Sequence, residues 1–123
     1  MILLTSTSDF IGLITGGNAT VTAHASWMDS SSTTVTPGRE DTTVSTPTTT
    51  VLVPPPGANT QRDVKNLVIT NTSSFGEQIE VGHTDGVHAL SLVSLFLAAG
   101  AALMWLPRTG WSQVGGNGVR SAA

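Results

Sequence analysis

The chain contains no cysteine and very little charge. The lack of cysteine excludes disulfides, thiolate metal sites and thiol catalysis. Charged residues make up 11% of the 123 residues, whereas an ordinary soluble domain has roughly 25%. Serine and threonine hydrate the surface instead, and a hydroxyl costs less than an ion to desolvate against a neighbouring protein. Because charge normally keeps protein surfaces apart, this composition favours a protein that assembles with others.

Basic residues are also scarce and scattered. The formal net charge is −3, and the basic residues stand singly at Arg39, Arg62, Lys65, Arg108 and Arg120. Since no basic stripe exists for a phosphate backbone, nucleic acid is not an expected partner. The first ten residues carry an apolar tripeptide without a basic region before it, so no secretory signal is expected.

Alternation of apolar and polar residues is clearest from Ala19 to Met28. Every second residue from Ala19 to Trp27 is apolar, which predicts a β-strand with Trp27 facing the core. Residues 29–34 are then expected as a polar loop. Pro37-Gly38 is expected as the turn that ends this region.

Further β-prone segments fill the rest of the chain. They are a short apolar piece at Phe10–Ile14 and expected strands at 41–53, 61–71, 77–84, 87–97, 101–106 and 111–114. Pro47 marks an edge, a bulge or a break within 41–53. The alternative interpretation of this Thr/Pro-rich region is a linker rather than a pair of strands. Asp85-Gly86 predicts a hairpin with a two-residue type I′ turn.

These patterns predict an all-β fold, an antiparallel β-sandwich or small barrel in a single domain. Residues 1–15 are expected as an N-terminal arm with a first short strand. Residues 16–114 are expected as the β-sandwich domain, and residues 115–123 as a flexible C-terminal tail.

One apolar stretch admits a second interpretation. Residues 89–106 contain no charge and reach the lower length of a membrane helix. Ser91, Ser94 and Gly100 dilute the hydrophobicity, however, and a helix would remove the return strand of the Asp85-Gly86 hairpin. We therefore expect a buried β-hairpin with residues 98–100 at its tip, and no membrane partner.

Residues that carry chemistry are few. His83 and His88 flank the expected hairpin turn, but beyond Asp85 and Glu80 no further metal ligand is evident. Glu77 and Glu80 are three residues apart and should face opposite sides of a strand, which excludes a catalytic acid pair. No serine lies in a nucleophile-elbow pattern. We therefore expect a protein that is not an enzyme, without catalytic residues, cofactor or metal.

The tryptophans and a few polar-face residues are the candidates for contacts. Trp27 is expected in the core, and Trp105 and Trp111 at an interface with another protein. His24, opposite Trp27 in strand parity, and Pro37 are the other expected interface residues. The alternative for Trp105 and Trp111 is a pair of stacking platforms in a carbohydrate-binding module.

The order of several sequence pieces resembles a family of small tailed-bacteriophage virion proteins. The matching pieces are HASWMDSSSTTVTPGRED, the Thr run to Val53, NTQRDVKNLVITN, VGHTDGV, LFLAAGAAL and the tryptophan near RTGW. The resemblance covers about residues 15 to 114 of this chain. Ala101-Ala102 stand where this family typically carries an acid or amide.

The resemblance implies a β-sandwich structural component of a virion with no catalytic residues. It implies a capsid decoration or cement subunit, located on the capsid surface. Its partners would be the major capsid protein or another virion protein, and further copies of itself in a homo-oligomer. The alternative is a tail, collar or fibre component of the same particle.

Overall fold

The structure is a computed structural model that describes residues 1–115 and 120–122. All regular structure in these residues is β, and they contain no helix. The strands are β1 (Ile2–Leu4), β2 (Phe10–Thr15), β3 (Val21–Ser30), β4 (Val35–Val44), β5 (Thr48–Val53), β6 (Gln61–Asn71), β7 (Glu77–Thr84), β8 (Ala89–Leu97), β9 (Ala102–Leu106), β10 (Gly110–Val114) and β11 (Arg120–Ala122).

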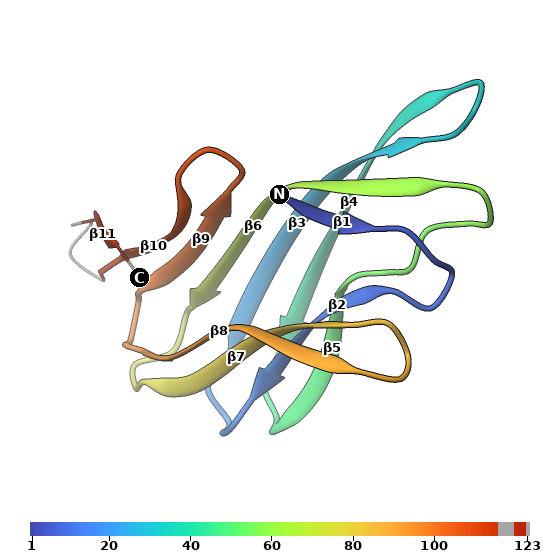
Figure 1. The fold of residues 1–123 in the computed structure, drawn as a ribbon. Coiled ribbons are helices and arrows are strands. Elements are labelled where there is room, and N and C mark those ends of the chain that lie inside the picture. The colour runs from blue at the N-terminus through green and yellow to red at the C-terminus, as the bar shows by residue number, and fades with distance from the viewer. Residues whose placement is uncertain (116–119, 123) are drawn as a thin grey trace.

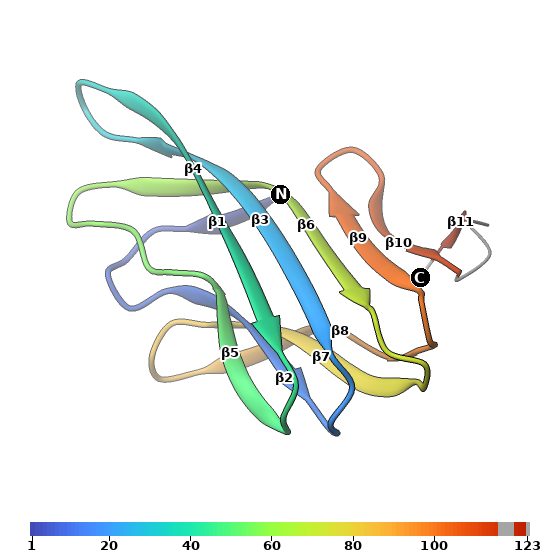
Figure 2. The ribbon, with the colours of Figure 1, turned by 180° about the vertical axis from the view of Figure 1, so that it is seen from behind.

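The strands form two antiparallel sheets that face each other (Figure 1). Sheet A has the order β11-β10-β9-β6-β3-β4, and β1 also pairs with β6. Sheet B has the order β5-β2-β7-β8. The view from behind shows β4 and β5 at the corner where the chain passes from sheet A to sheet B (Figure 2). The all-β antiparallel sandwich predicted from the sequence is confirmed.

One continuous core fills the space between the sheets, because each inner strand presents alternate apolar side chains to it. The buried face predicted for this alternating segment is confirmed: Ala19, just before β3, and Val21, Ala23, Ala25 and Trp27 within it are all buried. The largest fully buried side chains are Leu4, Ile11, Leu13, Val21, Leu52, Val53, Val64, Leu67, Ile69, Ile79, Leu97 and Leu103.

Arg62 closes one end of the sandwich. Its guanidinium lies 4.5 Å from the centroid of the Trp27 ring. Its Nε and Nη2 donate to the two carboxylate oxygens of Asp29 at 2.7 and 2.9 Å, and its Nη1 donates to the carbonyl oxygen of Pro54 at 2.7 Å. One planar cation therefore joins β3, β6 and the segment after β5, a geometry that lysine does not match.

The turn expected at Pro37-Gly38 is wrong. These residues lie inside β4 rather than in a turn, and the loop before β4 spans only residues 31–34. Proline is tolerated here because β4 is an edge strand, where an amide facing outward needs no partner. Of the edge, bulge or break left open at Pro47, the structure shows a break, since β4 ends at Val44 and β5 begins at Thr48.

The N-terminal segment, expected as an arm with a first short strand over residues 1–15, supplies two strands, one to each sheet. β1 pairs with residues 62–64 of β6, and β2 lies between β5 and β7. The physical reason is burial, because Leu4, Ile11 and Leu13 are completely enclosed. Of the tail expected at 115–123, residues 120–122 form β11 against β10. Residues 116–119 and 123 lie outside the described residues.

The Asp85-Gly86 hairpin is confirmed between β7 and β8. Its loop covers four residues, 85–88, and of its two central residues only Gly86 has a positive φ, of 91°. The two-residue type I′ turn was therefore wrong. Asp85 stabilises the longer loop by accepting hydrogen bonds from the amides of Val87 and His88 at 2.9 and 2.6 Å.

The buried hairpin expected at 89–106 was wrong. β8 belongs to sheet B and β9 to sheet A, so residues 98–101 connect the two sheets. Asn71, which is fully buried, fixes this crossing because its Nδ2 donates to the carbonyl oxygens of Phe75 and Leu97 at 2.8 and 3.0 Å. Among the described residues, no helix is long and apolar enough to cross a membrane.

Candidate interaction surface

The two C-terminal tryptophans lie opposite each other on β9 and β10. Trp105 is 5% exposed and belongs to the core, and Trp111 is half-buried against that core. The register Trp105–Leu67–Ala25 across the sheet places this pair on the inner face of sheet A. The expectation that Trp105 is an interface residue is therefore corrected, since the core already encloses its ring.

His24 and Pro37 lie on the opposite, outer face of sheet A. His24 Nδ1 is 2.5 Å from Oδ1 of Asp41, its register partner on β4. The hydrogen bond from His24 lowers the pKa of the Asp41 carboxyl below its usual value. Pro37 is exposed and lies opposite Met28 on the same face. The structure thus brings His24 and Pro37 onto one face and separates them from Trp105 and Trp111.

The histidines near the β7–β8 loop form separate contacts. His88 Nδ1 lies 3.5 Å from Asp85 Oδ2, whereas His83 Nε2 lies 4.0 Å from Asp9 Oδ1. The amides of His88 and Val87 lower the pKa of Asp85 to about 2. This carboxylate therefore holds the β7–β8 loop through its hydrogen bonds. Within the described residues, no group of three or more potential ligands is positioned to hold a metal ion.

Glu77 and Glu80 lie on opposite faces of β7, as the spacing predicted. Glu77 is buried, and its Oε1 accepts a hydrogen bond from the amide of Ala19 at 3.2 Å. Glu80 lies on the outer face of sheet B, opposite Ile14 in the register. Glu77 therefore anchors the turn before β3, and the two carboxylates do not share a reaction site.

A shallow apolar trough crosses the outer face of sheet B. Gly12 on β2 and Gly82 on β7 are register partners, so bare backbone forms its floor. Phe10, Ile14 and Ala89 line its sides, and the depression measures about 250 Å³. Sequence analysis missed this feature. Its signal was a glycine inside each of two predicted strands, which indicates close backbone approach.

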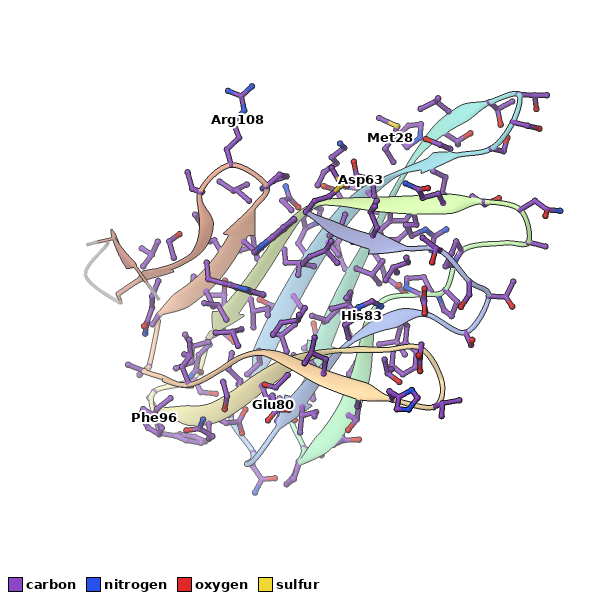
Figure 3. All side chains as sticks on the ribbon, in the orientation of Figure 1. Met28, Asp63, Glu80, His83, Phe96 and Arg108 are labelled. Carbon is purple, nitrogen blue, oxygen red and sulfur yellow. The ribbon has the colours of Figure 1, made fainter. Side chains whose placement is uncertain are left out.

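A second group of exposed apolar side chains lies along β8, one of the two edge strands of sheet B. Leu90 and Phe96 are 65% and 61% exposed, and Phe96 points away from the sandwich (Figure 3). Val87 and Phe75, near the two ends of β8, are exposed as well. The Phe96 ring lies so close to Gly76 that a Cβ there would overlap it. Together these four residues form what we call the β8 apolar band.

The β8 apolar band was also not predicted from the sequence, because residues 89–106 were expected to be buried. Apolar residues occur at both strand parities in ALSLVSLFL. A strand with one face on the core needs apolar residues at only one parity. This double pattern fits either a strand buried on both faces or a half-exposed edge, and the sequence alone does not distinguish them.

The chain matches no family model, no curated protein and no solved structure. Its function must therefore be argued from its own residues and geometry.

Proposed function

We propose that this protein is a non-enzymatic structural subunit of a bacteriophage virion, most specifically a decoration or cement subunit that binds the major capsid lattice. The sequence resemblance to small virion proteins supports the assignment to a bacteriophage particle. The scarcity of charge supports a surface that packs against other proteins.

The observation that carries the proposal is the apolar outer face of sheet B. Ile14 and Val51 are exposed there beside the trough floored by Gly12 and Gly82. A sheet face in a monomer is normally polar on the solvent side, so exposed apolar side chains around a groove mark a contact surface. We assign this face to the capsid.

The mechanism needs no chemical step. A rigid β-sandwich whose loops are fixed by hydrogen bonds loses little conformational entropy on docking. Bound across the junction of two capsid subunits, it adds buried area that must be lost before the junction opens. Because lattice symmetry repeats each contact, a modest affinity per site stabilises the whole shell.

Cryo-EM of the particle, combined with quantitative mass spectrometry, tests this assignment. We expect a β-sandwich on the outer shell, present in a fixed ratio to the major capsid protein over the whole lattice. A copy number that follows the rotational symmetry of the tail would replace the capsid role by a tail, collar or fibre role. Absence from the particle would refute both.

A binding assay tests the docking face. Ile14→Lys removes an exposed apolar group and places the cation opposite Glu80, so folding is preserved. We expect this variant to bind particles on the order of tenfold more weakly, as for a moderate interface contact. Val35→Lys, an equally drastic change at an exposed position of β4, is the matched control and should bind normally.

A further inference from the structure

Among the described residues, β4, β11, β5 and β8 end the two sheets, and the three-residue β1 adds a short edge beside β6. All of these edges except that of β8 are protected against pairing. β4 carries Pro37 and charged residues along its edge, and β11 is only three residues long. β5 is enclosed between Pro47 and Pro54 and lies at the corner beside β4 (Figure 2). Prolines, charges and short length are the usual means by which proteins prevent edge-to-edge association.

β8 lacks these protections. It has nine residues with no charge and no proline, and within the described residues it pairs only with β7. Half of its backbone groups point away from β7, and no other described strand accepts them. Its single irregularity is the register shift between its pairing with Val81 and with Gly82. The stretch from Val93 to Leu97 is therefore a regular, open edge.

The β8 apolar band runs along this same edge and has members at both ends of it. Val87 and Leu90 lie at the beginning of β8, whereas Phe96 and Phe75 lie at its end. Leu90 is the register partner of His83 and Phe96 that of Gln78, so the two side chains leave β8 on opposite faces of sheet B. A strand added to this edge would therefore meet an apolar side chain on each face.

We propose that β8 pairs antiparallel with β8 of a second copy of this chain, so that the two copies of sheet B form one continuous sheet. Charge is compatible with this occupant, because β8 carries no charged residue and its pairing with β8 of a second copy brings no like charges together. A stable interface buries roughly 800 Å² per partner, so the contact also requires the exposed apolar side chains beside the paired strands.

This inference deepens the proposed function and rests on it only in assigning the protein to an assembly. In the dimer, the outer faces of the two B sheets would adjoin. The two troughs would then be presented side by side to the capsid. Self-association is measured on the free chain and docking on particles, so each is tested by itself.

Sedimentation equilibrium of the full chain tests the dimer. We expect a reversible dimer, and we expect Leu90→Lys and Phe96→Lys each to raise its dissociation constant on the order of tenfold, the loss typical of an apolar contact near the end of a paired strand. Val35→Lys is the matched control and should dimerise as the original chain does. Far-UV circular dichroism verifies folding; should one variant unfold, the other, at the opposite end of β8, gives the same test.

Hydrogen exchange supplies an independent measurement. Amides of residues 89–97 should become more protected as the protein concentration rises, while the amides of the β4 edge should not change. A chain that stays monomeric at every concentration overturns the proposal, and so does a dimer that withstands both lysine substitutions. A monomer found on the capsid would refute the dimer alone, whereas a β8 dimer absent from particles would refute only the proposed function.

Discussion

A single glycine determines how closely β4 lies against Trp27. Gly38 is the register partner of Trp27, and a Cβ added at Gly38 would overlap the indole, with Cε2 at 2.6 Å. The indole cannot move aside easily, because it is buried in the core and lies beneath the guanidinium of Arg62. The edge strand therefore needs glycine at this position for steric reasons.

We predict that Gly38→Ala lowers the free energy of unfolding by about 1–3 kcal/mol, the usual cost of overpacking a closed contact. Gly57→Ala is the matched control, since the nearest atom to its added Cβ is Thr60 Oγ1 at 3.9 Å. That variant should stay within about 0.5 kcal/mol of the original. Urea unfolding followed by tryptophan fluorescence measures both, and equal stabilities of the two variants would contradict the argument.

Individual core residues were predictable where a regular pattern continued long enough. The alternation from Ala19 to Trp27 identified five buried residues, because a strand with one face on the core must repeat every second residue. Trp105 was misplaced because its strand, β9, has only five residues. The burial of such a short strand depends on its neighbours, which sequence periodicity does not reveal.

At the scale of an element, the connection from β1 to β2 depends on one carboxylate. Oδ2 of Asp9 accepts hydrogen bonds from the amides of Thr5 and Ser6 at 2.8 and 3.1 Å. The amide of Thr5 is the main cause that lowers the pKa of Asp9, opposed in part by desolvation and assisted by Ser6. The charged form thus holds the loop that carries the chain from sheet A to sheet B.

We predict that Asp9→Asn is less stable than the original chain by on the order of 1 kcal/mol near pH 6, because the amide oxygen is a weaker acceptor. The pKa of Asp9 is lower in the folded than in the unfolded chain, so its contribution is present above the unfolded value of 3.8. The contribution is lost as the pH falls through the folded value. The stability difference between the two proteins should therefore shrink between pH 4 and pH 2.

Unfolding curves at several pH values test this expectation. Glu40→Gln is the control, because it removes an exposed carboxylate from the edge strand β4. A difference between Asp9→Asn and the original chain that stayed constant down to pH 2 would exclude the charged carboxylate as the cause.

Elements were predicted best where turn chemistry was unambiguous and worst where proline had two interpretations. Asp85-Gly86 correctly identified a hairpin, and a break between two strands was one of the three possibilities left open at Pro47. Pro37-Gly38 has the same composition as a turn, yet it lies inside β4. Only the position of β4 at the sheet edge permits this, and edge position is a property of the sheet rather than of the local sequence.

At the scale of the whole molecule, the sequence pattern could not predict which strands belong to which sheet. A short polar or small-residue connection fits both a hairpin and a crossing between sheets. Residues 98–101 form a crossing because buried Asn71 binds the chain on both sides of it. The exposed Leu90 and Phe96 follow from that crossing, since it leaves β8 as an edge instead of enclosing it.

The N-terminal segment gives the sharpest test of this architecture. β2 lies in the interior of sheet B, where it pairs with β5 on one side and β7 on the other. A chain that starts at residue 16 loses Leu4, Ile11 and Leu13 from the core and leaves β5 without a partner. We predict that this truncated chain does not fold cooperatively, as judged by tryptophan fluorescence and near-UV circular dichroism.

Removing only residues 1–4 is the graded comparison. This change deletes β1 and the Leu4 side chain but keeps β2, so the chain should still fold with a loss of about 3–5 kcal/mol, as for a large cavity in a core. Met1→Ser, at a highly exposed position, should have little effect. A cooperative transition in the chain that starts at residue 16 would mean that β5, β7 and β8 form a sheet without β2, and the interior position of β2 would then be wrong.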